Sequence, residues 1–271
     1  MNGRLPRALS IAGSDSAGGA GIQADIKTFG ALGVFGMTAI TAVTVQNTQG
    51  VSAVQALQPS IVAAQITSVA SDIGVDAAKT GMLANAGIVH AVVEAVQHAE
   101  IEKLVVDPVA VSKHGDLLLE GSAVDVLRAE LLPVAMLVTP NLSEAEALSG
   151  LEVRTREDMR RAGDAIRASG VKAVLVKGGH LDGGMAADLL VDGDGEEWLE
   201  AERIQTRHTH GTGCTLSASI TAYLATGSDL RSSVRAGKVF VTKAIEHAID
   251  LGRGIGPVDP LWMWSAPEES D

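Results

Sequence analysis

Short apolar runs alternate with longer segments in which apolar residues recur every three or four positions. In the first half of the chain, the short runs predict strands at Leu5–Ala12, Met37–Val45, Asp76–Lys79 and Leu104–Val106. The recurring pattern predicts helices that carry Ile22, Ile26 and Phe29, that open at Pro59, and that span Ile88–Ala99. Because Met37–Val45 is apolar and β-branched, this strand is expected to be buried.

The second half repeats the alternation and then changes to a hairpin. Helices are predicted at Ala123–Leu131 and Met159–Ser169, and strands at Met136–Val138 and Ala173–Val176. The segments Ala186–Val191 and Glu196–Leu199 flank Asp192-Gly193-Asp194-Gly195, where glycine supplies the positive φ that a hairpin turn needs. Two helices, roughly Thr215–Ala225 and Arg231–Asp250, follow the hairpin.

Strands that alternate with helices are typical of an α/β protein. The order predicts a mostly parallel central sheet with helices on both faces and a small β-hairpin. Without a repeat, a low-complexity segment or a linker rich in Pro and Ser, one domain is expected over residues 1–264, with a frayed tail at 265–271. Such sheets bind ligands at the carboxyl ends of their strands, so function is expected in the polar clusters that follow each strand.

Composition and charge narrow the class of protein. The 271 residues carry a formal charge of −12, which argues against nucleic acid as a partner because phosphate binding needs a basic surface. No apolar run reaches the ~18 residues of a membrane helix, and no signal-peptide pattern opens the chain. The lone cysteine, Cys214, excludes an intrachain disulfide. We therefore expect a cytoplasmic protein with no membrane partner.

The first candidate cluster runs from Gly13 to Gly21, between a strand and a helix. Gly19-x-Gly21-x-x-Ala24 loosely matches a dinucleotide fingerprint, and a tight turn without ligand is the alternative. A dinucleotide site also needs an acidic residue near the end of the second strand. That place holds Gln46, whose amide donates and accepts at once, as suits the edge of a heterocycle. A packing role for Gln46 is equally open.

Other polar residues follow further strands. Asp25 lies four residues after Gly21 in a predicted helix, where an Asp is usually a solvated surface charge. The run Lys79-Thr80-Gly81-Met82-Leu83 is apolar enough to form a pocket wall or plain core. Asp107 and Glu144 follow successive strands, and carboxylates placed in this way can hold Mg²⁺ through oxygen ligands and water. Glu144 would also suit the first turn of a helix by its charge alone.

The strongest cluster is His208-Thr209-His210-Gly211-Thr212-Gly213-Cys214-Thr215-Leu216-Ser217, which opens a helix. Free N–H groups at the start of a helix bind anions, and the glycines let a phosphate approach them. Lys177, which precedes two glycines, can reach such a phosphate, although a surface lysine is the alternative. A free thiol is only about 3% ionised at pH 7, so Cys214 is expected to be a modest base. The two histidines have no third ligand close in sequence, which disfavours zinc.

Taken together, the segments resemble the hydroxymethylpyrimidine/phosphomethylpyrimidine kinase family of the ribokinase-like superfamily. The matching runs are AGSDSAGGAGIQADIKTFGALGVFGMTAITAVTVQNT, KTGML, VVDPV, TPNLSEAEAL, VLVKGGH, HTHGTGCTLSA and GIGP. They span nearly the whole chain in the order of the family. The resemblance implies a ribokinase-like three-layer α/β sandwich, usually a homodimer. It also implies ATP-dependent phosphorylation of 4-amino-5-hydroxymethyl-2-methylpyrimidine, and then of its monophosphate, in thiamine biosynthesis.

The resemblance also implies roles for individual residues. The pyrimidine pocket would be formed by Gln46, Gly13, Asp25, Met82 and Val109. The anion hole would be formed by Gly211, Thr212, Gly213 and Cys214, with Cys214 near the attacking hydroxyl. The phosphates of ATP would contact Asn141, Lys177, Thr209 and Thr212, and Mg²⁺ would be held by Asp107 and Glu144. Residues 109–116 are expected to form a mobile flap, and a requirement for a monovalent cation stays open.

The sequence also bears on several alternative functions. A pyridoxal kinase of the same superfamily would use the same anion hole and a similar pocket. Most sugar kinases of the superfamily carry Asp where this chain has Cys214, which argues against a sugar kinase. A dinucleotide-dependent oxidoreductase is disfavoured because the chain lacks the carboxylate that would bind the ribose. An inactive sensor of the precursor is disfavoured because the chain retains Cys214, Lys177 and Glu144. The chain has no GxxxxGK[ST] motif, so a P-loop is excluded.

Overall fold

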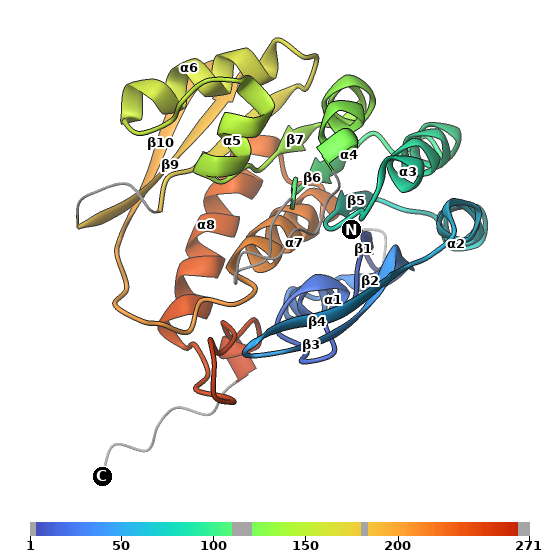
Figure 1. Ribbon diagram of the computed structural model, residues 1–271, viewed down its shortest axis with the longest axis horizontal. Coiled ribbons are helices and arrows are strands. Elements are labelled where there is room, and N and C mark those ends of the chain that lie inside the picture. Colours follow the sequence, from blue (N-terminus) through green and yellow to red (C-terminus); the bar gives the residue numbers. More distant parts are fainter. Residues whose placement is uncertain (1–3, 110–120, 180–183, 265–271) are drawn as a thin grey trace.

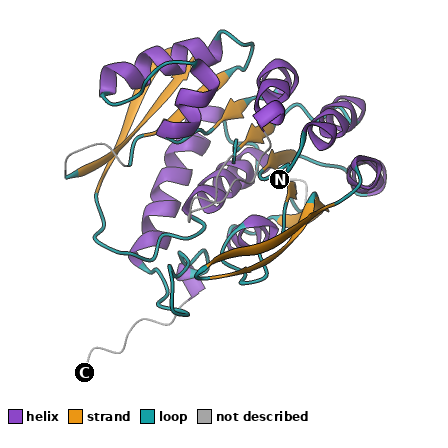
Figure 2. Ribbon diagram, viewed as in Figure 1, coloured by secondary structure: helices purple, strands orange, loops and turns teal. Residues whose placement is uncertain are grey.

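A computed structural model of the chain describes residues 4–109, 121–179 and 184–264. The strands are β1 (Arg7–Ala12), β2 (Phe35–Ile40), β3 (Ala42–Asn47), β4 (Gly50–Ala56), β5 (Ala77–Thr80), β6 (Leu104–Val106), β7 (Leu137–Val138), β8 (Ala173–Lys177), β9 (Met185–Asp192) and β10 (Gly195–Glu202). The α-helices are α1 (Gly21–Ala31), α2 (Pro59–Asp72), α3 (Ala86–His98), α4 (Gly121–Val126), α5 (Leu142–Ser149), α6 (Arg156–Arg167), α7 (Thr212–Ala225) and α8 (Leu230–Glu246). Figures 1 and 2 show the helices gathered around the central strands.

The strands form one large sheet and one small one. The large sheet has eight strands in the order β10-β9-β8-β7-β6-β5-β1-β2, and it is parallel from β2 to β8. Strands β9 and β10 continue it as an antiparallel hairpin. The two-stranded sheet consists of the antiparallel pair β3 and β4. The predicted α/β class with a mostly parallel sheet and a hairpin is therefore confirmed.

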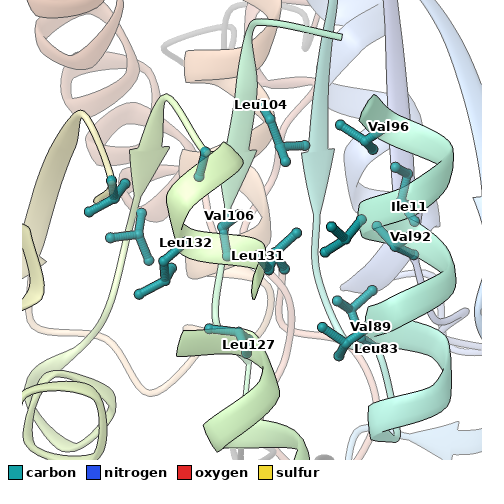
Figure 3. Packing of buried hydrophobic residues seen from close by; sticks show 14 of the residues in the cluster. Ile11, Leu83, Val89, Val92, Val96, Leu104, Val106, Leu127, Leu131 and Leu132 are labelled. Carbon is teal, nitrogen blue, oxygen red and sulfur yellow. The ribbon is translucent and has the colours of Figure 1, made fainter. Parts of the chain in front are cut away.

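Helices cover both faces of the large sheet because successive strand residues point to opposite sides. In β6, Leu104 and Val106 join a buried cluster that includes side chains of α2 to α6, and Val105 joins a second cluster with α7 and α8. Figure 3 shows Leu104 and Val106 in the first cluster beside Val92 of α3 and Leu131. The strands therefore read as continuous apolar runs, and the layers are helix, sheet and helix.

The prediction of one buried strand over Met37–Val45 is wrong. Strand β2 ends at Ile40 beside β1, and β3 then leaves the large sheet to pair with β4. The change of direction occurs at Thr41, which is fully buried and donates from Oγ1 to the carbonyl oxygen of Met82 at 2.6 Å. Val43 and Val45 are 50% and 60% exposed, because one face of the β3–β4 pair has no covering layer in the described residues.

Other differences are smaller. The helix predicted at Ala123–Leu131 begins as α4, becomes a π-helical turn at Leu127–Leu131 and ends as a 3₁₀ turn at Leu132–Val134, where Pro133 removes a backbone donor. Helix α8 ends at Glu246, four residues before the predicted end. Most of the predicted flap and the predicted tail, residues 110–116 and 265–271, lie outside the described residues. Within the part that is described, no helix combines the length and apolar character needed to cross a bilayer.

Candidate active site

Two glycine-containing loops touch at one edge of the large sheet. The loop from Gly13 to Ala20 follows β1, and the loop from His208 to Gly211 precedes α7. Gly211 has a φ of +80°, and a Cβ on it would overlap the carbonyl oxygen of Gly19. A Cβ on Gly19 would lie 2.7 Å from Cδ2 of His210. Glycine at 211 therefore lets the two backbones approach this closely, and glycine at 19 leaves room for the His210 ring.

The start of α7 presents backbone donors beside these loops, of which the Thr212 N–H already makes a long bond of 3.4 Å to the carbonyl oxygen of Thr209. Gly211 is the N-cap residue, and no side chain of the described residues caps the first amides of the helix. Thr212 donates from Oγ1 to the carbonyl oxygen of Thr209 at 2.8 Å, which fixes the approach of the chain to the helix. The first-turn N–H groups and the positive end of the helix dipole together suit an anion.

A buried ion pair lies beneath this first turn. Lys177 Nζ is 3.0 Å from Oδ1 of Asp107, and Thr139 donates from Oγ1 to the same oxygen at 3.1 Å. A Cβ on Gly213 would be 3.5 Å from both Lys177 Nζ and Asp107 Oδ2. Burial by itself would raise the pKa of Asp107, but the charges of Lys177 and Lys79 outweigh it and hold that pKa below its ordinary value. An ionised carboxylate and an ammonium group thus face the anion site.

Asn141 and Glu144 join this ion pair through the cap of α5. The Asn141 N–H donates to Glu144 Oε2 at 2.8 Å, and the Glu144 N–H donates to Asn141 Oδ1 at 2.9 Å, which is a capping box. The same Glu144 oxygen lies 3.9 Å from Lys177 Nζ. Burial opposes the charged form of Lys177, but Asp107 and Glu144 raise its pKa well above the ordinary value. Glu144 therefore has both the local helix role and a position beside the Lys177 ammonium.

A second buried ion pair involves a lysine that the sequence did not single out. Lys79 Nζ lies 2.8 Å from Oδ1 of Asp25, and Ser10 donates to the other carboxylate oxygen at 2.6 Å. The side chains of Lys79 and Asp25 are both fully buried, so Asp25 is not the solvated helix charge that is usual for this residue. Burial lowers the pKa of Lys79, but the negative charges of Asp25 and Asp107 outweigh it and raise that pKa. Lys79 is therefore charged at neutral pH. Burial also raises the pKa of Asp25, because desolvation outweighs the opposing charge and hydrogen bond of Lys79.

The thiol of Cys214 lies between these charges and the glycine loops. The residue is partly exposed, but desolvation of the thiol, with Asp25 and Asp107, raises the pKa of Cys214 to about 11. The charge of Lys79 and the N–H of Gly21 only partly oppose this rise. With this pKa, roughly one thiol in ten thousand is ionised at pH 7. Cys214 is thus suited to hydrogen bonding through its S–H group more than to proton abstraction.

The predicted pocket residues Gly13 and Met82 are in contact. A Cβ on Gly13 would overlap the terminal methyl group of Met82, so the thioether packs directly on the glycine backbone. The Thr41 hydroxyl holds the Met82 carbonyl group, which ties the Met82 backbone to the end of β2. Val109 lies two residues after Asp107 and donates from its N–H to the Asp107 carbonyl oxygen at 2.8 Å. Gly13 and Met82 therefore form one wall, whereas Asp25 stands behind it with Lys79.

Gln46 connects the two-stranded sheet to the loop before α7. Its amide Nε2 is 3.4 Å from Nε2 of His210, and its Oε1 is 3.3 Å from Oγ1 of Thr44. His210 Nε2 is also 2.9 Å from Oδ2 of Asp15 in the first glycine loop. Because His210 directly precedes Gly211, the amide of Gln46 lies beside the anion site and not in a separate part of the molecule.

The GIGP run, residues 254–257, holds these parts together. The Ile255 N–H donates to the carbonyl oxygen of Thr48, in the turn between β3 and β4, at 2.8 Å. The Gly256 N–H donates to Nδ1 of His208 at 3.0 Å, and the Val258 N–H donates to the carbonyl oxygen of His210 at 3.0 Å. The run therefore links the two-stranded sheet to the loop that leads into α7.

Sequence reasoning missed three charged or titratable members of the site. Lys79 was included only as part of an apolar wall, and Asp15 only as part of a glycine cluster. His210 was considered only as a metal ligand with His208, but the two histidines have different partners, Asp15 for one and Gly256 for the other. A lysine inside an apolar strand was the one available signal, since such a lysine needs a buried counter-charge.

Known proteins are similar to this chain in sequence and in fold. The sequence model of the phosphomethylpyrimidine kinase family matches residues 15–259. The hydroxymethylpyrimidine/phosphomethylpyrimidine kinase of Streptomyces coelicolor is 52% identical over 257 residues, which cover 95% of each chain. Pyridoxal kinase of Bacillus subtilis, solved with ADP, has a TM-score of 0.90 at 40% identity and covers 96% of this chain and 99% of its own. Phosphomethylpyrimidine kinase of Clostridium difficile 630 has a TM-score of 0.80 at 44% identity, with coverage of 89% and 100%.

Proposed function

The chain belongs to the phosphomethylpyrimidine kinase family, and we propose that it phosphorylates 4-amino-5-hydroxymethyl-2-methylpyrimidine and then the resulting monophosphate, with ATP as donor, in thiamine biosynthesis. The observation that carries this proposal is the contact of Gln46 with His210, the residue before the anion site. It brings a group that can pair with a heterocycle next to a group that can bind a phosphate. Both are needed for transfer between a nucleotide and a ring substituent.

The nucleotide phosphates are assigned to the cationic side of the site. Asn141, Lys177, Thr209 and Thr212 would contact them, and the N–H groups from Gly211 to Cys214 would receive the transferred phosphoryl group. Support comes from Lys177, which stays charged, and from the uncapped start of α7. Fixed donors aimed at a phosphoryl group stabilise the charge that spreads over its oxygens during transfer.

The carboxylates fit a magnesium ion. Asp107 and Glu144 both face the Lys177 ammonium, at 3.0 and 3.9 Å, so an ion beside Lys177 could be reached by both. Mg²⁺ prefers oxygen ligands and keeps several waters, which suits two carboxylates and a triphosphate. When bound, it neutralises charge on the phosphates. Asp107 and Glu144 would hold it, and the Thr139 hydroxyl orients Asp107.

The pyrimidine is assigned to the pocket beside Gln46. Its amide would pair with the amino group and the adjacent ring nitrogen, and Gly13, Met82 and Val109 would enclose the ring. Asp25 would act from behind by holding Lys79 in place. Because the Cys214 thiol keeps its proton at neutral pH, its role would be to position the attacking hydroxyl, and most of the rate would come from alignment and charge stabilisation.

The direct test is a product assay. Purified protein is incubated with ATP, Mg²⁺ and the hydroxymethylpyrimidine, and mass spectrometry is expected to find the monophosphate followed by the diphosphate. Gln46→Leu should lower kcat/KM for the pyrimidine by at least about 100-fold, because polar groups built to pair are left unpaired. Gln49→Leu, in the exposed turn after β3, is the matched control and should change little. Absence of both phosphates with the unmodified protein would refute the proposal.

Pyridoxal phosphorylation is a second candidate activity. It is favoured by the pyridoxal kinase of Bacillus subtilis, whose structure is similar over 96% of this chain. The two activities are separated by offering pyridoxal and the hydroxymethylpyrimidine to the same preparation and comparing kcat/KM. We expect the pyrimidine to be preferred. A clear preference for pyridoxal, together with little effect of Gln46→Leu, would reverse the assignment.

A homodimer and a cytoplasmic location complete the proposal. Val43 and Val45 lie exposed on one face of the two-stranded sheet, and a second copy of the chain would cover this apolar face. Sedimentation equilibrium would test this, with Val45→Lys expected to favour the monomer. The single cysteine suits a reducing compartment. Because the formal charge of the chain is −12, small anionic substrates would be attracted only where cationic side chains lie locally at the site.

A further inference from the structure

We propose that Asp15 and His210 form a positioning pair that turns the carboxamide oxygen of Gln46 toward the anion site and its NH₂ group toward Thr44. The pair would thereby select an aminated ring and aim its hydroxymethyl group at the phosphate. This inference rests on the proposed function, because it concerns how the same site orients its pyrimidine. It depends on the donors and acceptors that surround one amide, which has two ends of nearly identical shape.

The proton on His210 is fixed by Asp15. The Asp15 carboxylate receives the backbone N–H groups of Ala17, Gly19 and Ala20 at 2.9, 3.0 and 2.8 Å, and these groups can only donate. Burial raises the pKa of Asp15, but the hydrogen bonds from His210 and these amides outweigh it and hold the pKa below its ordinary value. Asp15 is therefore an acceptor only, and Nε2 of His210, 2.9 Å away, must carry a proton.

A protonated Nε2 determines which end of the Gln46 amide belongs beside it. This nitrogen has no free lone pair, so it cannot accept from an NH₂ group at 3.4 Å. The one proton of Nε2 is donated to Asp15, but an amide oxygen beside this partly positive N–H group is still favoured over an NH₂ group, which would place two donors against each other. A half-turn about the last side-chain bond of Gln46 exchanges the two ends without changing the space that the side chain occupies.

The opposite end of the amide leads to the same orientation independently. The Thr44 hydroxyl has one proton, and its shorter contact is the carbonyl oxygen of Ser14 at 2.9 Å, against 3.3 Å to the Gln46 amide. Once that proton is donated to Ser14, Thr44 can only accept from the amide. An NH₂ group is required there, and Thr44 is buried, so water does not readily replace it.

The orientation decides which ring fits and how. The carboxamide oxygen accepts from the 4-amino group, and the NH₂ group donates to ring nitrogen N3. The hydroxymethyl group is on C5, next to C4, so it lies on the side of the amide oxygen. That side faces His210, the residue directly before the N-cap of α7. If the amide had the opposite orientation, its NH₂ group would donate to a 4-oxo group and its oxygen would accept from a protonated N3. A 4-oxo ring would then be bound with its hydroxymethyl group in the same position.

The test compares two substrates that differ only at this edge. The unmodified protein, Asp15→Asn and His210→Phe are assayed with the 4-amino substrate and its 4-oxo analogue. The unmodified protein should favour the amino substrate by at least about 100-fold in kcat/KM. Both variants should lower this ratio at least tenfold, mainly through KM for the pyrimidine, with KM for ATP unchanged within twofold. Asp15→Asn should lower it further, since an Asn NH₂ group can donate to His210 and remove the proton from Nε2.

A matched control and a second measurement make the result decisive. His90→Phe removes another histidine that contacts a carboxylate, Glu130 at 2.6 Å, on the exposed surface, and should leave the ratio unchanged. An unchanged ratio in folded Asp15 and His210 variants would overturn the inference. If both variants fail to fold, ¹⁵N NMR of the histidines in the unmodified protein gives the protonation of His210 directly. An Nε2 without a proton overturns the inference, and a protonated Nε2 supports it. If the unmodified protein phosphorylates no pyrimidine, it is the proposed function that fails.

Discussion

The buried pair of Lys79 and Asp25 gives the sharpest stability prediction. Lys79→Met keeps the length of the side chain but removes its charge, and it leaves the Asp25 carboxylate fully buried with Ser10 as its remaining hydrogen-bond partner among the described residues. Removing one member of a buried ion pair typically destabilises a protein by about 3–5 kcal/mol, because the other charge is left uncompensated. We therefore expect a large loss of stability from this substitution at a fully buried position.

A limit on the loss follows from protonation of Asp25. Without Lys79, Asp25 can bind a proton in the folded variant and so lose its charge. Protonating a carboxyl group of ordinary pKa, near 3.9, costs about 1.36 kcal/mol for each pH unit above that pKa, or about 4 kcal/mol at pH 7. Since the folded variant binds a proton that the unfolded chain releases, the loss should shrink by about 1.4 kcal/mol per pH unit as the pH falls from 7 toward 5. For a chain of 271 residues, about 4 kcal/mol corresponds to a Tm lowered by roughly 7 °C.

The assay is urea unfolding and thermal melting of Lys79→Met, Asp25→Asn and the double variant at pH 5, 6 and 7. The double variant should recover at least about 2 kcal/mol relative to the sum of the single losses. Lys243→Met is the control, because its partner Glu246 is on the surface, and its effect should stay within about 0.5 kcal/mol. A loss below about 1 kcal/mol at pH 7, or a loss that does not change with pH, would refute the reasoning.

Three further predictions follow from the same geometry. With the pKa of Cys214 at about 11, kcat should change less than threefold between pH 7 and 9, whereas a thiolate base would raise it about tenfold per pH unit; Cys214→Ser should lower kcat and leave KM for ATP unchanged. Gly211→Ala should lower kcat/KM at least 100-fold because its methyl group would overlap the Gly19 carbonyl oxygen, whereas Gly227→Ala, also at positive φ but in open space, should cost only about 1 kcal/mol and no activity. The guanidinium of Arg7 lowers the pKa of Asp76, so Asp76→Asn should destabilise the protein fully above about pH 4, and the difference from the unmodified protein should vanish as the pH falls further, in acid titrations followed by circular dichroism.

The sequence was informative wherever the signal is local. Glycines before a helix predict an anion site because the donors belong to neighbouring residues, and the run from Gly211 to Cys214 starts α7 as expected. Asp107 and Glu144 were assigned to one place because parallel strands bring their carboxyl ends to one edge, and both face Lys177. The apolar runs predicted the order of most strands, because burial on both faces demands them.

The hydrophobic pattern failed to predict the strand boundary where two consecutive apolar segments pair with different strands. Met37–Val45 reads as a single apolar strand, and nothing in its periodicity indicates that β2 ends at Ile40. The division depends on Thr41, whose hydroxyl group is held by a carbonyl group 41 residues away. The same change exposes Val43 and Val45 and places the Gln46 amide beside His210, so the position of the amide proposed to bind the substrate depends on it.

The amino-acid sequence by itself determined the layered α/β architecture and the glycine-rich start of α7, and it predicted the residues that we propose hold a nucleotide, because each depends on spacing within a short segment. Only the tertiary structure decided that Lys79 is the counter-charge of Asp25 and that His210 joins Asp15 to Gln46, over separations of 54, 195 and 164 residues. The physical reason is that a buried charge or amide is defined by the partners around it in space. Those partners are chosen by packing of the whole chain, which local periodicity does not encode.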